Sequence, residues 1–207
     1  HAKSHETIAH TERMKQLSLG FGRYLGLAER ELADLGLAAV FHDMGLIALP
    51  ESILKSTGSL SPTQWEEMRR HPEVGFRIAE SSKTLGHIAP IILHHHEHWD
   101  GSGYPRGIRG EDIPYLARII AIVDAFEVMT HGRPYAFERS YSEALAAIQE
   151  QRGKQFDPQL AEGFIRYVQS EKKLDVSFLE RPKSQIRKKH PVPSANADRF
   201  IASKTME

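Results

Sequence analysis

Histidine is the residue type that stands out in this sequence, because it is abundant and clustered. The chain has 12 histidines, and four of them fall in the run HHHEH at residues 94–98. His95 and His96 lie four residues after Ile91 and Ile92, so a helix through this region turns both rings toward the faces that the isoleucines bury. Two buried histidines side by side repel each other when protonated, which favours a shared metal ion. We expect the other two histidines of the run to face solvent or to support their neighbours.

A lone carboxylate lies in the most apolar helical segment of the chain. Asp124 interrupts the run IIAIVDAF at residues 119–126. A buried carboxylate costs several kcal/mol unless it is paired or binds a metal. Asp124 is therefore either a hydrogen-bonded or salt-bridged core residue or a metal ligand.

Adjacent histidine and aspartate residues end another apolar stripe. His42 continues the helical spacing of Leu32, Leu35 and Ala39, so it points inward, and Asp43 follows it directly. Such a pair supplies one nitrogen and one oxygen ligand to one or two metals. By itself the pair is weak evidence, since two-residue matches are frequent by chance.

Three further residues have the right chemistry for the same role. Glu6 and His10 are one helical turn apart, which suits either a pair of ligands or an exposed helix pair. His71 is held just before Pro72, where a single histidine is either structural or a ligand.

Together these segments provide five histidines and three carboxylates as candidate metal ligands. The chain has no cysteine, which excludes disulfides, zinc ribbons, iron–sulfur clusters and thiol catalysis. Nitrogen and oxygen ligands without sulfur suit iron, manganese or zinc in multinuclear hydrolytic sites. The candidate ligands are Glu6, His10, His42, Asp43, His71, His95, His96 and Asp124.

The elements that would position these residues are all helical. The apolar spacing predicts helices over 6–25, 28–44, 84–98 and 114–130, with further helices opening at Ser61, Pro72, Ser140 and Asp157. Trp65 and Met68 are expected to face the core. Residues 46–60 and 99–113 read as loops, and no segment has the period of a strand. We expect an all-α domain over residues 1–170 and a basic, flexible tail over 171–207, which carries nine basic and five acidic residues.

Charge and hydropathy narrow the class of partner. Lys+Arg and Asp+Glu are both 27, so the formal net charge is zero, which argues against a nucleic-acid polymer as partner. No apolar run approaches the ~20 residues that span a bilayer. The chain begins with His1 rather than Met, so we expect it to be part of a longer protein.

The candidate ligands fall within a set of motifs that resembles the HD-GYP domain, a branch of the HD superfamily of metal-dependent phosphohydrolases. The matching strings are HDMG at 42–45, HPE at 71–73, HHEHWDGSGYP at 95–105, ARI at 117–119, Asp124, RPY at 133–135 and FDP at 156–158. The long HHExWDGSGYP string is very specific, whereas HD alone is not. The match covers roughly residues 4–170.

The resemblance implies an all-α helical bundle with a GYP-containing loop and two or three divalent metal ions, iron or manganese. It implies hydrolysis of cyclic di-GMP to linear pGpG, to GMP, or to both, in bacterial second-messenger signalling. Asp43 and His42 would be catalytic, and all eight candidate ligands would bind metal, with Glu6 marking the three-metal variety. Substrate would be bound by Arg133 and by the loop residues Gly103, Tyr104 and Pro105, and Arg109 is a further candidate for this role.

Three positions depart from the family pattern. Leu46 stands where the family usually has lysine, Ala136 where it has a basic residue, and Glu127 where it has aspartate. The first two changes remove expected phosphate contacts, so two alternatives stay open. One is a catalytically weak or degenerate module that binds a cyclic dinucleotide or a protein. The other is an HD phosphohydrolase for another nucleotide.

The resemblance also bears on context. A sensory or receiver domain preceding this fragment and a homodimer are compatible with it. We expect a cytoplasmic domain, whether or not the full-length protein is tethered to a membrane.

Overall fold

The chain folds into helices throughout the part that the structure describes. The computed structural model describes residues 2–54, 56, 59–131 and 139–172. Within these residues it contains no strand, only one isolated bridge between Arg152 and Phe156. The prediction of an all-α fold is therefore confirmed.

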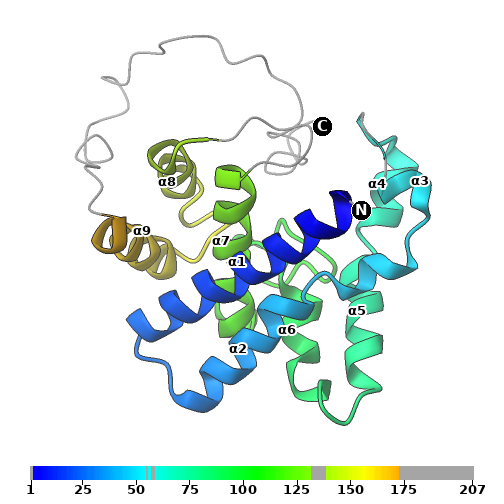
Figure 1. Ribbon diagram of the computed structural model, residues 1–207, viewed down its shortest axis with the longest axis horizontal. Coiled ribbons are helices and arrows are strands. Elements are labelled where there is room, and N and C mark those ends of the chain that lie inside the picture. Colours follow the sequence, from blue (N-terminus) through cyan, green and yellow to red (C-terminus); the bar gives the residue numbers. More distant parts are fainter. Residues whose placement is uncertain (1, 55, 57–58, 132–138, 173–207) are drawn as a thin grey trace.

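Nine α-helices and three short 3-10 helices follow one another in the described residues (Figure 1). They are α1 (Ala2–Tyr24), α2 (Glu29–Phe41), η1 (Met44–Ala48), α3 (Glu51–Leu54), α4 (Pro62–Met68), α5 (His71–Glu80), η2 (Gly86–Ile88), α6 (Ala89–His94), η3 (Gly110–Asp112), α7 (Tyr115–His131), α8 (Tyr141–Glu150) and α9 (Pro158–Lys172).

Capping residues fix several helix starts, as the sequence predicts. The Ser61 hydroxyl accepts a hydrogen bond from the Gln64 backbone N–H at 3.3 Å, and the Gln64 side chain accepts one from the Ser61 N–H at 2.9 Å. Ser140 and Glu143 form the same reciprocal pair at α8. Each pair satisfies backbone donors that a helix start leaves without a partner.

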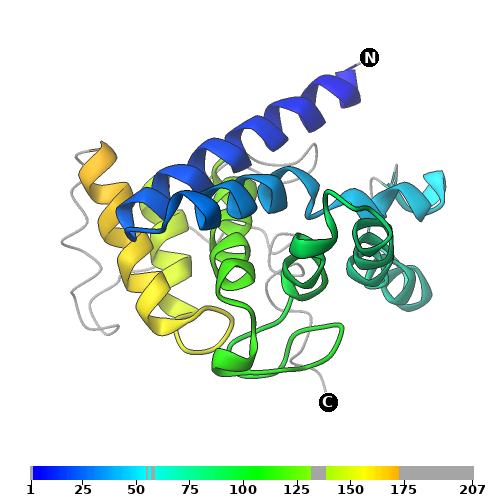
Figure 2. The same ribbon diagram turned by 90° about the horizontal axis from the view of Figure 1, so that it is seen from below.

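Helix α7 forms the centre of the core. It packs against α1, α2, α6, α8 and α9. Figures 1 and 2 show it in the middle of the molecule, with α8 and α9 on one side and α5 and α6 on the other. Ile119, Ile120, Ile122 and Val123 are fully buried, so Asp124 follows directly on the most apolar part of the structure.

The predicted loop over 46–60 is wrong in part. The η1 helix continues directly from Asp43, where the Leu46 N–H donates to the Asp43 carbonyl at 2.9 Å. Pro50 then opens α3, because its carbonyl accepts from the Ile53 N–H at 2.9 Å.

The predicted helix over 84–98 is also too long. Its regular part is α6, which ends at His94, and η2 precedes it. Pro90 lies in the first turn of α6. Proline has no N–H to donate and fits only at a helix start, so a continuous helix cannot run through this position.

Helix α4 contributes less to the core than expected. None of its residues is fully buried, and Trp65 and Met68 are only half-buried. The helix is short and lies toward one edge of the molecule (Figure 1).

Helix α9 runs to Lys172, two residues past the predicted boundary, and the predicted tail beyond it lies outside the described residues.

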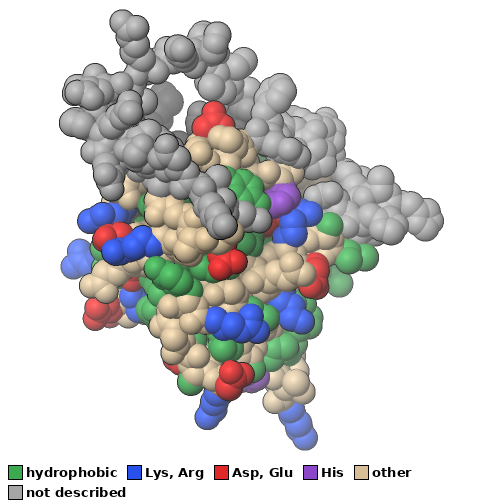
Figure 3. Space-filling view, turned by 60° about the vertical axis from the view of Figure 1, so that its left-hand side comes forward, with side chains coloured by type: hydrophobic (Ala, Val, Ile, Leu, Met, Phe, Trp, Pro, Cys, Tyr) green, Lys and Arg blue, Asp and Glu red, His purple; other side chains and the backbone are tan. Residues whose placement is uncertain are grey.

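Basic and acidic side chains are interspersed over the described part of the face in Figure 3. Among the described helices, none is both long and apolar enough to cross a membrane.

Candidate metal centre

Three histidines from different elements are held in the same way. Each donates its Nδ1–H to the backbone carbonyl three residues before it, which leaves the Nε2 lone pair to face the interior. The bonds measure 3.0 Å from His42 to Ala39, 2.8 Å from His71 to Met68 and 2.6 Å from His95 to Ile92. The local backbone therefore fixes both the tautomer and the direction of these rings.

Asp43 lies at the point where these rings converge. Its carboxylate is 3.3 Å from His71 Nε2, 3.5 Å from His42 Nε2 and 3.8 Å from His95 Nε2. It belongs to two groups of candidate ligands, in each of which one atom per residue lies within 4.8 Å of the others. One group joins Asp43 to His71, His95 and His96, and the other joins it to His10 and His42. A carboxylate common to two groups can bridge two metal ions.

A close contact of two backbones puts Asp43 beside His71. A Cβ on Gly45 would overlap the His71 carbonyl oxygen and lie 2.6 Å from the Gly75 nitrogen. Only glycine therefore lets η1 lie this close to the start of α5. The glycine of the HDMG string thus helps to position the aspartate two residues before it.

Several buried polar atoms of this cluster have no hydrogen-bond partner among the described residues. They include His10 Nε2, His42 Nε2 and Asp124 Oδ1. His71 Nε2 and His95 Nε2 are also 3.3 Å apart, although each presents a lone pair when its Nδ1–H is donated. Buried unpaired atoms and facing lone pairs are costly unless a cation lies between them. The arrangement therefore fits divalent metal ions.

The pKa shifts divide the cluster into two sides. The carboxylates beside His42 attract positive charge, whereas His95 and His96 disfavour protonation. Burial lowers the pKa of His42, but the carboxylates of Asp43 and Asp124 outweigh it and raise this pKa to about 9. Burial raises the pKa of Asp43, yet the neighbouring histidines hold it well below its usual range. Burial, followed by the charges of two nearby histidines, lowers the pKa of His95 to about 3, and the pKa of His96 is lowered for similar reasons. Neutral rings at these two positions keep their lone pairs available for a metal near pH 7.

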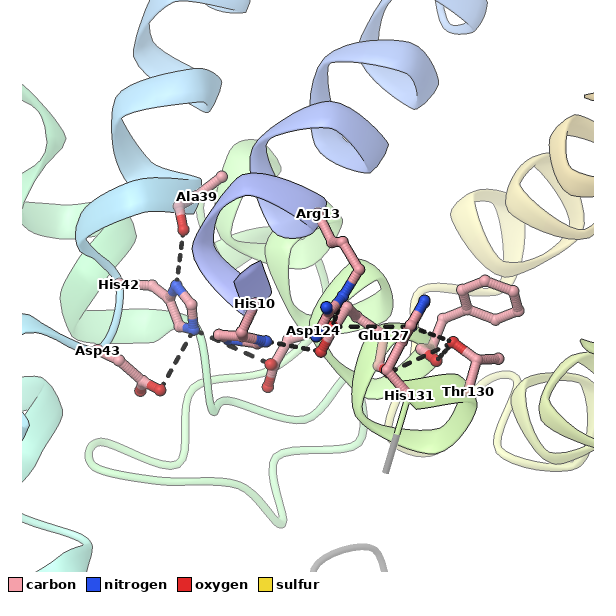
Figure 4. Close-up of polar contacts among 10 residues, drawn as sticks. His10, Arg13, Ala39, His42, Asp43, Asp124, Glu127, Thr130 and His131 are labelled. Carbon is pink, nitrogen blue, oxygen red and sulfur yellow. Dashed lines mark hydrogen bonds and ion pairs between the residues drawn. The ribbon is translucent and has the colours of Figure 1, made fainter. Parts of the chain in front are cut away.

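Asp124 and His10 reach the cluster from two different helices, α7 and α1. Figure 4 shows His10 of α1 and Asp124 of α7 beside His42. Asp124 Oδ1 is 3.9 Å from His42 Nε2. His10 Nδ1 donates to the Glu127 carboxylate at 2.6 Å, and Arg13 Nε donates to the same carboxylate at 2.6 Å. Glu127 is only 2% exposed.

The GYP loop reaches the cluster through aromatic stacking. The Tyr104 ring stacks on the His96 ring at 4.9 Å between centroids, and the Arg69 guanidinium lies 5.2 Å from the Tyr104 centroid. Gly103 is buried, and a Cβ there would overlap the His98 nitrogen. Glycine at position 103 is therefore required for packing of the loop, whatever it contributes to substrate binding.

Seven of the eight candidate ligands are near one another in the structure. The eighth, Glu6, lies in α1, but its side chain is outside the described part. Arg133 also lies outside the described residues. Arg109 is exposed, and within the described residues it forms no ion pair.

The sequence interpretation did not single out two carboxylates near the cluster as functional. Glu127 was noted only as a departure from the family pattern, although its spacing of three residues from Asp124 puts both on one side of α7. Glu97 is buried inside the histidine run and accepts the Arg106 N–H at 2.7 Å, which ties the GYP loop to the segment that follows α6. The available signal for Glu97 was its position inside the specific HHExWDGSGYP string.

Comparisons with known proteins identify the family. Residues 2–160 match the HD domain family. The cyclic di-GMP phosphodiesterase of Thermotoga maritima is 39% identical over 165 residues, which are 78% of this chain and 44% of that protein. The cyclic di-GMP phosphodiesterase response regulator RpfG of Xanthomonas campestris pv. campestris is 40% identical over 162 residues, or 77% of this chain and 43% of that protein.

A solved structure gives the same result. The cyclic GMP-AMP-specific phosphodiesterase of Vibrio cholerae superposes with a TM-score of 0.63 and 25% identity, over 83% of this chain and 46% of that chain. The chain belongs to the HD domain family. Within this family, its relatives confirm the resemblance to HD-GYP domains. The chain spans less than half the length of the two sequence relatives described above.

Proposed function

We propose that this chain is a metal-dependent phosphodiesterase domain that hydrolyses a cyclic dinucleotide, with cyclic di-GMP as the first candidate substrate. The observation that carries the proposal is the convergence of histidine Nε2 atoms on Asp43, which two groups of candidate ligands share. The names of the relatives support it, because two are cyclic di-GMP phosphodiesterases and the solved structure acts on cyclic GMP-AMP. The linear dinucleotide pGpG, GMP or both would be the products.

The chain's own residues would bind and orient the metal ions. We assign His71, His95 and His96 to one ion, His10 and His42 to another, and Asp43 to both, with Asp124 beside His42. Bound divalent ions lower the pKa of water to generate hydroxide at neutral pH and polarise a phosphoryl oxygen. Asp43 and His42 would hold the reacting groups in place, since the His42 ring is fixed by the Ala39 carbonyl and the Asp43 carboxylate lies against the rings of His42 and His71. Nitrogen and oxygen ligands suit iron, manganese or zinc, and the resemblance to HD-GYP domains implies iron or manganese, with Glu6 adding a third ion.

The GYP loop would form the substrate-binding side of the site. Tyr104 stacks on His96, so a substrate at the cluster would meet this ring and the adjacent Gly103–Pro105 backbone. Arg133 and Arg109 are the proposed phosphate contacts. A cytoplasmic location, a homodimer and a neighbouring sensory or receiver domain stay predictions.

Hydrolysis is tested with the purified chain, reconstituted anaerobically with Fe(II) or Mn(II). The chain is incubated with cyclic di-GMP, cyclic GMP-AMP or a noncyclic dinucleotide, and the products are separated by chromatography. Metal-dependent formation of linear product from a cyclic dinucleotide supports the proposal. Binding of the cyclic dinucleotide without turnover would instead favour a degenerate binding module. This alternative arises because Leu46 and Ala136 replace basic residues that the family usually has.

Replacing Leu46 by lysine is expected to raise kcat/KM for cyclic di-GMP. Leu46 is half-buried in η1, three residues after Asp43, and offers no charge to a substrate phosphate. A charge-assisted hydrogen bond is worth roughly 1.5–3 kcal/mol, or about one to two decades in rate or affinity. Steady-state kinetics of the Leu46→Lys variant measure the gain.

The matched control for this change is Ile47→Lys, because Ile47 is adjacent and 83% exposed. It adds the same charge at the surface and should change kcat/KM little. Arg133→Ala should weaken substrate binding strongly in the wild-type background. A fast wild-type enzyme that tolerates Arg133→Ala would show that the phosphate contacts lie elsewhere.

A further inference from the structure

His10 is held differently from three other candidate ligands, His42, His71 and His95. The rings of His42, His71 and His95 are fixed by carbonyls of their own chain segment. The His10 ring is fixed instead by Glu127, a side chain from another helix, at 2.6 Å. The orientation of His10 therefore depends on how α1 lies against α7.

Glu127 is itself tightly constrained. Its carboxylate is buried, and it accepts a second hydrogen bond from Arg13 Nε at 2.6 Å, while His131 Nδ1 lies 3.7 Å away. Burying a carboxylate is costly unless it is paired in this way. Arg13 is one turn after His10 on α1, and Glu127 is one turn after Asp124 on α7. The two helices therefore face each other through the His10–Glu127 and Arg13–Glu127 contacts (Figure 4).

The hydrogen bond decides which nitrogen of His10 faces the cluster. When Nδ1–H is donated to Glu127, the lone pair resides on Nε2. His10 Nε2 is buried and has no hydrogen-bond partner among the described residues, and a ring nitrogen of His10 lies within 4.8 Å of ligand atoms of His42 and Asp43. An unpartnered buried nitrogen on a ring beside two candidate ligands is what a metal ligand requires.

We infer that Glu127, held by Arg13, is a positioning residue that orients His10 and makes metal binding at the His10, His42 and Asp43 group depend on the docking of α1 against α7. This inference rests on the proposed function for the presence of metal ions, but not for the reaction. Carboxylates that orient metal-binding histidines typically change metal affinity by about 10–100-fold when they are removed. The group at His71, His95 and His96 should be unaffected, because its rings are held by local carbonyls or by Tyr104.

A double-mutant cycle in the full chain tests the inference. Metal-free wild type, Glu127→Gln, His10→Ala and the double variant are titrated with Mn(II) by calorimetry, and metal content is checked by elemental analysis. Glu127→Gln is nearly isosteric and should weaken one class of Mn(II) site by about 10–100-fold. The same change in the His10→Ala background should have no further effect, because the residue through which Glu127 acts is already absent.

Hydrogen exchange supplies a second readout. Mn(II) should slow exchange of the α1 amides near His10 in the wild type, and this protection should be lost in Glu127→Gln. Glu127→Asp keeps the charge and should retain more Mn(II) affinity than Glu127→Gln. The control is Glu162→Gln, which removes a similar 2.6 Å carboxylate–arginine pair with Arg166 on the exposed side of α9.

Two results would overturn the inference. One is wild-type Mn(II) affinity in a folded Glu127→Gln variant. The other is an equal loss of affinity with and without His10, which indicates a purely structural role. If the wild type binds Mn(II) as described but hydrolyses no cyclic dinucleotide, the proposed function fails and the role of Glu127 stands.

Discussion

Replacing Asp43 by alanine is expected to abolish the proposed hydrolysis of cyclic di-GMP while the helical fold persists. Asp43 is the residue common to both groups of candidate ligands, so its loss removes a ligand from each. It also leaves His42 buried without its nearest carboxylate, 3.5 Å away. We expect a fall in kcat/KM of about 10³-fold or more, equivalent to roughly 4 kcal/mol of transition-state stabilisation. Kinetics, elemental analysis and circular dichroism measure activity, metal content and helicity in one preparation.

The matched control is Asp34→Ala. Asp34 has nearly the same side-chain exposure as Asp43, 26% against 27%, and also lies beside a histidine, His87, at 3.0 Å. Asp34 lies in α2, eight residues before His42, and belongs to neither group of candidate ligands. Asp34→Ala should keep full metal content and activity. Full metal loading in Asp43→Ala would contradict the bridging role.

Much of the fold could be predicted from local signals. Ser61 and Ser140 carry their own capping partners three residues later, so both helix starts follow from the sequence alone. The apolar run around Asp124 correctly predicts the central helix. These features depend on residues a few positions apart, which is why the sequence specifies them well.

Features that depend on contacts between distant segments were harder to predict. The η1 helix needs the close contact between Gly45 and α5, and a pattern read along residues 46–60 contains no such contact. The start of α6 is a different case, because Pro90 is visible in the sequence and fixes where this helix begins.

The candidate site shows the same division. The inward direction of His42 and His95 follows from apolar residues one turn earlier, and both are buried in the structure. The partner of His10 could not be identified this way, because Glu127 is 117 residues away in the chain. The close packing of Gly103 against His98 is likewise a property of the folded loop that the sequence does not show.

Replacing Gly45 by alanine is expected to damage stability and metal binding together. The new Cβ would overlap the His71 carbonyl oxygen and lie 2.6 Å from the Gly75 nitrogen, so η1 and α5 must separate. Overpacking of this kind costs about 1–3 kcal/mol of unfolding free energy. The same separation moves Asp43 away from His71, and a shift of ~1 Å at a reacting centre can cost ~10²-fold in rate. Thermal unfolding, Mn(II) titration and kinetics measure the three effects.

Gly163→Ala is the control that separates this effect from the general cost of losing a glycine. Gly163 lies inside α9, and the nearest atom to a new Cβ is 3.7 Å away, which is ordinary packing distance. Alanine favours a helix interior over glycine by roughly 0.5–1 kcal/mol, so this variant should be more stable than the wild type, with unchanged metal content. If Gly45→Ala also keeps wild-type stability and Mn(II) affinity, the contact between η1 and α5 does not hold Asp43 in place. Loss of both properties in Gly45→Ala alone would show that this one backbone contact positions the aspartate shared by the two ligand groups.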